Sequence, residues 1–462
     1  MATTESTAAT ATDLQDLARR HLWLHFSRMG GYDDQHEIPI ITRGEGCYVW
    51  DDKGNKYFDG LSALFCVNIG HGRHEVAQAG ADQAKELEFV TNWSYAHPQA
   101  ITLAARIASL APGDLNRVFF TSGGGEAVET AIKASRQFWK LSGKPTKTKV
   151  IAREVAYHGT TMGALSATGI TDLRQPFEPL MPGGTHVPNT NLYRLPYQMR
   201  PEDLAETVKD KIEFEGPDTV AAVIMEPVQN AGGCFTPPDG YFQRVREICD
   251  EYDVLMISDE VICSWGRLGE FFGCQRLGYQ PDIITTAKGI TSAYAPMGAM
   301  IASDRVFEPF SQDHTSFLHG YTFAGHPIAC AVAHANIDVF EQDGLLDHVK
   351  ATEPVFRDMM ESLRDIPIVG DVRGMGFFQA VELVKDRETK ASFDEEESEW
   401  LLRGFLSGEL YRRGLICRAD DRGDPVIQLA PPLITTAEQF GEIHDILRPV
   451  LEEASQRLGL KA

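Results

Sequence analysis

Apolar segments at several places in the chain end in a side chain that can take part in catalysis. The pairs of segment and following residue are Val220–Met225 with Glu226, Val254–Ser258 with Asp259, Ile283–Ala287 with Lys288, and Arg117–Phe120 with Thr121 and Ser122. In an open α/β sheet, ligands bind in the crevice outside the carboxyl ends of the strands. The sequence therefore predicts one ligand site to which these side chains contribute.

Lys288 is the most informative of these residues. It follows a run of apolar or small residues and precedes Gly289, so its ammonium group is poorly placed to reach solvent. Desolvation lowers the pKa of a lysine and makes its amine nucleophilic, which reaction with an aldehyde requires. A buried ion pair is the alternative interpretation of this lysine.

Asp259 ends an apolar strand, where an unpaired carboxylate would be costly. We therefore expect it to have a cationic partner or a strong hydrogen-bond donor. Asp259 and Glu260 could also form a metal-binding pair of the kind found in nucleotide-hydrolysing enzymes. The chain lacks the G-x-x-x-x-G-K-[ST] loop of those enzymes, so we expect no metal.

The turn Ser122-Gly123-Gly124-Gly125 joins a predicted strand to an amphipathic helix, Glu126–Lys140. Glycines let the backbone approach an anion, and the first N–H groups of the helix favour negative charge. A plain strand-to-helix turn is the alternative interpretation. Together, the amine, the carboxylate and the turn match what pyridoxal phosphate needs: an amine for its aldehyde, an acid beside its ring nitrogen and an anion site.

The elements that position these residues follow from the hydrophobic pattern. Between about residues 70 and 330, nearly continuous apolar runs alternate with helical patterns. This alternation is typical of the α/β class, with a mostly parallel sheet covered by helices on both faces. We expect a large domain at 71–330.

The remaining segments predict a smaller α+β domain, made of residues 15–70 and 331–462. The predicted elements are a hairpin of Tyr48–Asp51 and Lys56–Asp59, a helix at Ala331–Phe340, strands at Val369–Leu383 and Ile427–Leu429, and a helix at Ala437–Leu458. Residues 1–14 are expected to form a disordered tail.

Composition and charge exclude several classes of function. The net charge of −23 argues against binding to nucleic acid or an anionic membrane surface. No apolar run is long enough to span a bilayer, and the N-terminus has no secretory signal pattern. The eight cysteines form no C-x-x-C pair, so we expect reduced thiols in a cytoplasmic protein.

A family resemblance runs from about Arg43 to Leu458. The blocks that carry it are F-D-G-L-S-A-L-F-C-V-N-I-G-H-G, Y-H-G-T-T, E-P-V-Q-N-A-G-G, I-S-D-E-V-I-C-S-W-G-R-L-G, A-K-G-I-T-S-A-Y-A-P-M-G and H-G-Y-T-F-A-G-H-P. In these blocks the chain resembles the class III (ω-amino acid, amine:pyruvate) aminotransferases, which are fold-type I enzymes that use pyridoxal 5′-phosphate.

The resemblance implies roles around the cofactor ring. Lys288 would hold the cofactor as a Schiff base and then move the proton during catalysis. Asp259 would pair with the ring nitrogen and keep it protonated. Tyr157 and Val261 would pack on opposite faces of the ring. His158 would brace Asp259, with a purely structural core histidine as the alternative.

The resemblance also implies how the phosphate is held. Gly124 and Gly125 would offer backbone N–H groups, in the turn that includes Ser122 and Gly123. Similar enzymes usually carry a small hydroxyl residue at the position of Gly125, so one side-chain bond to phosphate is lost here. Thr322 would reach the phosphate of the neighbouring subunit, which implies a homodimer with shared active sites, or a tetramer built from such dimers.

On the substrate side the resemblance places Phe65, Trp93 and Ala231 in the pocket. Arg418 would grip the carboxylate of the keto acid, because a guanidinium group binds a carboxylate through two parallel hydrogen bonds. A solvated loop charge is the alternative for Arg418. Glu226 belongs to a matching block, but the sequence does not identify its partner.

The implied reaction moves an amino group from an amine or ω-amino acid to a keto acid, with pyruvate as the expected acceptor, in two half-reactions. An aminomutase, decarboxylase or epimerase on the same fold is the alternative. A cofactor-binding regulator would need a DNA-reading module, and the sequence shows no basic region for one.

Overall fold

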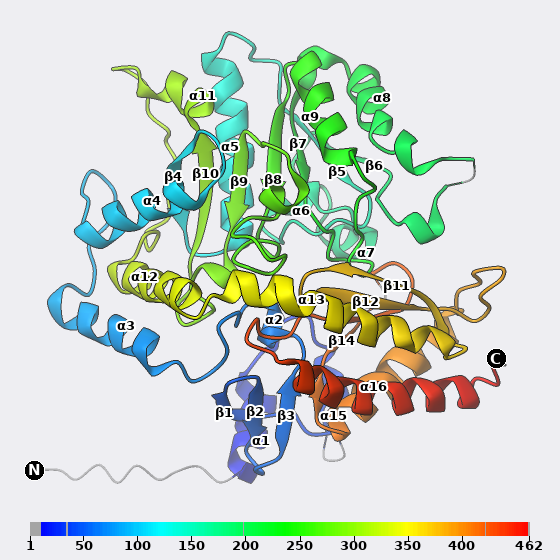
Figure 1. Cartoon of the computed structure of the whole chain (residues 1–462). Helices are drawn as coiled ribbons and strands as arrows, with labels where there is room; N and C mark the ends of the chain where they lie inside the picture. Colours follow the sequence, from blue (N-terminus) through cyan, green and yellow to red (C-terminus); the bar gives the residue numbers. More distant parts are fainter. Residues whose placement is uncertain (1–10, 34–35, 197, 421, 461–462) are drawn as a thin grey trace, which may run out of the picture.

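The computed structural model describes residues 11–33, 36–196, 198–420 and 422–460. Its centre is a seven-stranded sheet (Figure 1). The strands, in spatial order, are β4 (Leu115–Thr121), β10 (Gly298–Ser303), β9 (Ile283–Thr286), β8 (Leu255–Asp259), β7 (Val220–Met225), β5 (Lys149–Arg153) and β6 (Gly184–Val187). Only β10 runs antiparallel to its neighbours among these strands, so the predicted mostly parallel sheet is confirmed.

Helices cover both faces of this sheet, as the near-continuous apolar strands predicted. Successive residues of a strand point to opposite faces. In β7, Ala222 and Ile224 belong to the core cluster that includes α5 (Gly124–Leu141), whereas Val223 and Met225 belong to the cluster that includes α9 (Tyr241–Glu251). The strand is therefore buried on both sides, and the α/β class is confirmed.

Two smaller sheets lie below the central one in Figure 1. One has the order β1 (Ile41–Glu45), β2 (Tyr48–Asp51), β3 (Lys56–Asp59) and β13 (Leu415–Ile416), and the other β11 (Val369–Met375), β12 (Phe378–Leu383), β15 (Val426–Leu429) and β14 (Arg418–Asp420). The hairpin predicted between β2 and β3 is present. Because β13 pairs in parallel with β3, segments from the two ends of the chain share one sheet.

The predicted strand Val369–Leu383 is in fact two strands, β11 and β12, which form a tight antiparallel hairpin. Gly376 lies in its turn with a φ of +57°, and a Cβ there would meet the Arg267 carbonyl oxygen at 2.4 Å. The continuous apolar pattern hid this turn, because both strands of the hairpin are largely buried.

Buried Arg267 ties the smaller sheets to the large one. Its Nη1 donates to the carbonyl oxygen of Phe377 at 3.0 Å, and its Nη2 donates to Ser62 Oγ at 3.2 Å and Asn68 Oδ1 at 2.6 Å. Its Nη1 also donates to the Pro431 carbonyl oxygen at 2.5 Å, so one guanidinium group satisfies acceptors from three separate segments. These bonds hold the chain around residues 62–68 against the large sheet.

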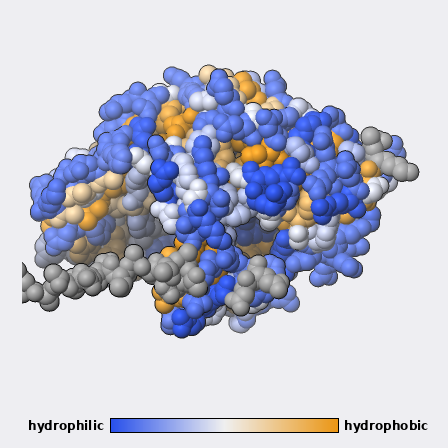
Figure 2. All heavy atoms as spheres, turned by 90° about the horizontal axis from the view of Figure 1, so that it is seen from below, coloured by the Kyte–Doolittle hydropathy of each residue, from blue (hydrophilic) through white to orange (hydrophobic). Residues whose placement is uncertain are grey.

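The other helices are α1 (Ala11–His21), α2 (Ser62–Phe65), α3 (His74–Glu86), α4 (Pro98–Leu110), α6 (Met162–Ala167), α7 (Thr171–Arg174), α8 (Glu206–Glu215), α10 (Gly273–Leu277), α11 (Asp304–Phe307), α12 (Pro327–Gln342), α13 (Leu345–Glu361), α14 (Glu395–Glu399), α15 (Ser407–Arg412) and α16 (Ala437–Arg457). Both predicted helices of the C-terminal segment, within α12 and at α16, are present. No helix among the described residues is long and apolar enough to cross a membrane. The face in Figure 2 is mainly hydrophilic, with separate hydrophobic patches.

The prediction of a disordered tail at 1–14 is wrong for its last residues, because α1 begins at Ala11. Residues 1–10 lie outside the described part of the chain. Gln15 docks this helix: its Nε2 donates to the Ile38 carbonyl oxygen at 2.8 Å, and its Oε1 accepts from Ile38 N–H at 3.0 Å. The buried contact is long-range in sequence, so the local composition did not reveal it.

Candidate active site

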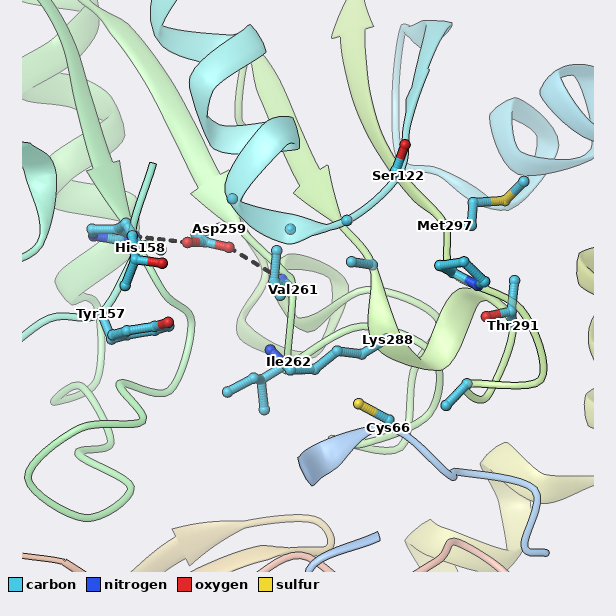
Figure 3. Close-up of a pocket in the computed structure, with 18 of the residues that line it drawn as sticks. Cys66, Ser122, Tyr157, His158, Asp259, Val261, Ile262, Lys288, Thr291 and Met297 are labelled. Atoms are coloured by element: carbon cyan, nitrogen blue, oxygen red, sulfur yellow. Dashed lines mark hydrogen bonds and ion pairs between the residues drawn. The ribbon is translucent and has the colours of Figure 1, made fainter. Parts of the chain in front are cut away.

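A cavity of about 490 Å³ opens at the carboxyl edge of the central sheet (Figure 3). Its walls include the strand-end residues Ser122, Glu226, Asp259 and Lys288, together with the segment that follows β5. The structure thus brings together side chains that are up to 166 residues apart (Ser122 to Lys288). The parallel arrangement of the strands is the cause, because it aligns their carboxyl ends.

Asp259 is buried and accepts several hydrogen bonds. His158 Nδ1 lies 2.7 Å from Asp259 Oδ2, while Thr285 Oγ1 and Val261 N–H donate to Oδ1 at 3.1 and 3.2 Å. The expected strong donors are therefore present, and His158 contacts the carboxylate directly (Figure 3). Thr285 was missed in the sequence; it is the register partner of Asp259 on the neighbouring strand.

Glu226 organises the backbone beside the cavity. Its Oε1 accepts from Tyr157 N–H at 3.2 Å and its Oε2 from Asn230 N–H at 2.8 Å. Burial raises the pKa of this carboxyl group. These bonds supply the partners that the sequence left unidentified, and they fix the start of the segment that carries Tyr157 and His158.

Lys288 extends across the cavity from a short 3-10 turn that follows β9 (Figure 3). Burial lowers the pKa of its ammonium group, which increases the fraction of neutral, nucleophilic amine. Its backbone has a φ of +49°, a left-handed conformation that is strained for a residue with a side chain. Such strain often accompanies functional sites, and here it aims the side chain into the cavity.

The glycine turn brings the N-terminus of α5 to the cavity wall. Gly123, Gly124 and Gly125 all line the cavity. A Cβ on Gly124 would lie 2.7 Å from Val261 Cγ1, so only glycine lets the helix begin this close to Val261. A Cβ on Gly125 would meet Thr161 Cγ2 at an ordinary 3.6 Å. The helix end can serve as an anion site, as expected.

The Glu260 carboxylate has hydrogen-bond partners of its own. It accepts from the N–H groups of Gly273 at 2.6 Å and Cys274 at 2.8 Å, and from Ser258 Oγ at 3.0 Å. The residues described here contain no cluster of three or more His, Cys, Asp and Glu that could hold a metal ion.

The substrate-side residues named from the sequence lie outside the cavity wall itself. Phe65 and Ala231 are buried. The Arg418 side chain is only 14% exposed, its guanidinium carbon lies 5.9 Å from the centre of the Phe65 ring, and its Nε lies 3.1 Å from Asp420 Oδ2. The interpretation of Arg418 as a solvated loop charge is therefore wrong.

Trp93 and Thr322 lie away from the cavity of their own chain. Trp93 is 61% exposed and lines a separate cavity of about 350 Å³ with residues that include Tyr95 and Tyr321. Thr322 is exposed. Other residues of the main cavity, among them Cys66 and Thr291, were not identified from the sequence, because a single thiol or hydroxyl carries no distinctive pattern.

The residues present fit pyridoxal phosphate. The cavity offers an amine at Lys288, a buried carboxylate at Asp259 and an anion site at the start of α5. Tyr157 and Val261 present two side chains that could flank a flat ring. Amine, acid and anion site thus share one cavity, which is the donor set this cofactor needs.

Comparison with known proteins agrees with this chemistry. The sequence model of the family "Aminotransferase class-III" matches residues 31–451. The chain is 57% identical to a probable aminotransferase of Mycobacterium tuberculosis, over 96% of this chain and 95% of that protein. It is 39% identical to the putrescine–pyruvate aminotransferase of Pseudomonas aeruginosa, over 97% and 98%.

Among solved structures, an (S)-enantioselective ω-transaminase from Thermomicrobium roseum superimposes with a TM-score of 0.93. It shares 39% identity, over 97% of this chain and 99% of that one. The fold is therefore that of the fold-type I transaminases. The chain belongs to the class III aminotransferases, which are enzymes that depend on pyridoxal 5′-phosphate.

Proposed function

We propose that this aminotransferase passes the amino group of an amine or ω-amino acid to pyruvate. The observation that carries the proposal is the position of Arg418, a guanidinium group that is only 14% exposed and lies 5.9 Å from the centre of the buried Phe65 ring. A carboxylate adjacent to the reacting carbonyl would meet this charge. The similarity to a putrescine–pyruvate aminotransferase supports the same acceptor.

Lys288 is the proposed acid and base of the reaction. When bound, pyridoxal phosphate supplies a ring that stabilises negative charge on the carbon that loses its proton. The Lys288 Nζ takes that proton and returns it at the neighbouring carbon. Burial lowers the pKa of Lys288, so a larger fraction of its amine is neutral and able to accept that proton.

Asp259 is the proposed partner of the ring nitrogen, and His158 is its positioning residue. The short contact between His158 Nδ1 and Asp259 Oδ2, with the bond from Thr285, orients the carboxylate. Tyr157 and Val261 hold the ring between them in this proposal. Glu226 contributes by fixing the backbone N–H of Tyr157.

Ser122, Gly123, Gly124 and Gly125 are the proposed phosphate site. These residues line the cavity at the start of α5, where the helix dipole favours an anion. Phe65, Trp93 and Ala231 are proposed to shape the substrate pocket, with Trp93 doing so across a subunit boundary.

A homodimer with shared sites completes the proposal. Thr322, the proposed second phosphate ligand, is exposed and does not line its own cavity. The large side chains of Trp93, Tyr95, Leu318 and Phe323 are also more than half exposed. Exposed apolar surface of this kind is typical of protein–protein interfaces, which supports burial against a second copy. The eight free cysteines support the expected cytoplasmic location.

The acceptor is tested by steady-state amine consumption with pyruvate or with 2-oxoglutarate. Pyruvate should give the higher kcat/KM, and Arg418→Ala should reduce the pyruvate half-reaction by about 10–100-fold, the value of a desolvated charge-assisted contact. Preference for 2-oxoglutarate would overturn the pyruvate assignment. Amine consumption without any keto acid would point to the other chemistries of this fold.

A further inference from the structure

A second arginine, Arg422, lies beside the cavity and was not identified from the sequence. It follows β14 on the turn toward β15, and its side chain is 21% exposed. Its guanidinium carbon lies 5.7 Å from the centre of the Tyr157 ring and 5.6 Å from that of the Phe26 ring. Tyr157 lines the cavity, whereas Phe26 is 67% exposed, so Arg422 lies between the cavity wall and the solvent-facing N-terminal segment.

Asp420 holds both arginines through its one carboxylate. Its Oδ2 lies 3.1 Å from Arg418 Nε, and its Oδ1 lies 3.6 Å from Arg422 Nε. The Asp420 side chain is only 7% exposed. Two guanidinium groups therefore share this carboxylate, and each of the two contacts is made through the Nε edge of its arginine. A guanidinium group has five N–H donors, so each arginine retains donors for a second carboxylate.

The two arginines act at different depths. Arg418 contacts the buried Phe65 ring, and its charge reaches Lys288. Arg422 instead contacts the Tyr157 ring and the exposed Phe26 ring. The Arg418 side chain is 14% exposed and the Arg422 side chain is 21% exposed. Arg422 is therefore the outer cation and Arg418 the inner one.

We propose that Arg422 is a specificity-determining residue that binds the remote carboxylate of ω-amino acid donors. This inference rests on the proposed function, in which Arg418 binds the carboxylate adjacent to the keto group of the acceptor. A donor whose carboxylate is several carbons from its amine places that carboxylate farther from Lys288, toward the outer cation. Asp420 orients both guanidinium groups while the substrate carboxylates are exchanged.

The test compares the donor half-reaction of the holoenzyme for matched pairs of substrates. 5-Aminopentanoate and pentylamine have the same carbon chain but differ in the carboxylate. Arg422→Ala should lower the single-turnover kcat/KM for 5-aminopentanoate by about 10–100-fold, as expected for a lost charge-assisted contact. The rate with pentylamine, and the half-reaction with pyruvate, should stay within about twofold. Arg422→Lys should recover part of the loss, because it keeps the charge.

Control variants distinguish carboxylate binding by Arg422 from a general effect of removing a positive charge. Arg412→Ala removes the same charge from an exposed side chain that pairs within its own helix, and it should leave both donors unchanged. Arg418→Ala should act mainly on pyruvate. Equal losses on 5-aminopentanoate and pentylamine, or no loss on either, would overturn the assignment of Arg422. If the unmodified enzyme reacts with pentylamine but does not accept pyruvate, the proposed function is wrong. This result does not depend on whether Arg422 binds the donor carboxylate, so the two outcomes can be told apart.

Discussion

At the scale of single residues, Lys288 carries the central prediction. Its left-handed backbone and the lowering of its pKa by burial support a nucleophilic amine, and we predict that this amine forms the covalent link to the cofactor. Borohydride reduction followed by peptide mapping should place the label on Lys288. Lys288→Ala should lose covalent attachment while keeping the fold. Label recovered on another lysine would refute the assignment.

Asp259 offers a second test at this scale. Asp259→Asn keeps the size of the side chain but removes the negative charge that would stabilise a protonated ring nitrogen. Losing this charge in a buried setting should cost several kcal/mol of transition-state stabilisation, or about 10³-fold in kcat. Steady-state kinetics measure the effect, with circular dichroism as the control for folding. A variant within about tenfold of the parent enzyme would contradict the role.

A substitution at Gly125 should increase the affinity for the cofactor. A Cβ at this position would lie 3.6 Å from Thr161 Cγ2, which leaves room for a small side chain, and serine would add a hydroxyl donor at the anion site. Gly125→Ser should tighten cofactor binding by roughly 10–100-fold, the value of one hydrogen bond to a charged group. Fluorescence titration of the apoenzyme with pyridoxal phosphate measures the affinity. Unchanged or weaker binding would show that the phosphate lies away from this residue.

At the scale of elements, the N-terminus of α5 and Val261 must pack closely. Gly124→Ala would place a methyl group 2.7 Å from Val261 Cγ1 and push the helix end away from the cavity. We expect at least about a tenfold loss of cofactor affinity from the misplaced N–H groups. Gly125→Ala is the matched control: it sits in the same turn without a clash, and alanine favours the helix by up to about 1 kcal/mol. Equal affinities for the two variants would contradict the packing explanation.

At the scale of the whole molecule, the proposed sharing of active sites between two subunits makes a prediction about mixed dimers. Lys288→Ala and Thr322→Ala subunits should each be impaired alone. In a mixed dimer, one site combines the intact Lys288 of one subunit with the intact Thr322 of the other, so activity should return. Refolding or subunit exchange of tagged variants, with purification of the mixed species, measures this. Mixed dimers without restored activity would show that Thr322 serves its own subunit, and a fully active Thr322→Ala variant would show that it serves neither site.

Much of the fold was predictable because the hydrophobic pattern of a segment agrees with how deeply that segment is buried. The apolar strands β7, β8 and β9 are buried on both faces, and their runs end close to where the strands end. The sequence missed β6, a short strand at the edge of the sheet that is only partly buried. It also missed β10, a buried strand that runs antiparallel and so lacks the strand–helix alternation.

The sequence by itself determined the chemistry: Lys288, Asp259 and the glycine turn stand out because their types are unusual after apolar strands. Only the tertiary structure decided which groups support them. Thr285 reaches Asp259 through strand register, and Glu226 reaches Tyr157 through a hydrogen bond across 69 residues. Arg422 likewise contacts the Tyr157 ring only because the chain folds back on itself over a long stretch of sequence. Such contacts depend on the path of the whole chain, and no local spacing encodes them.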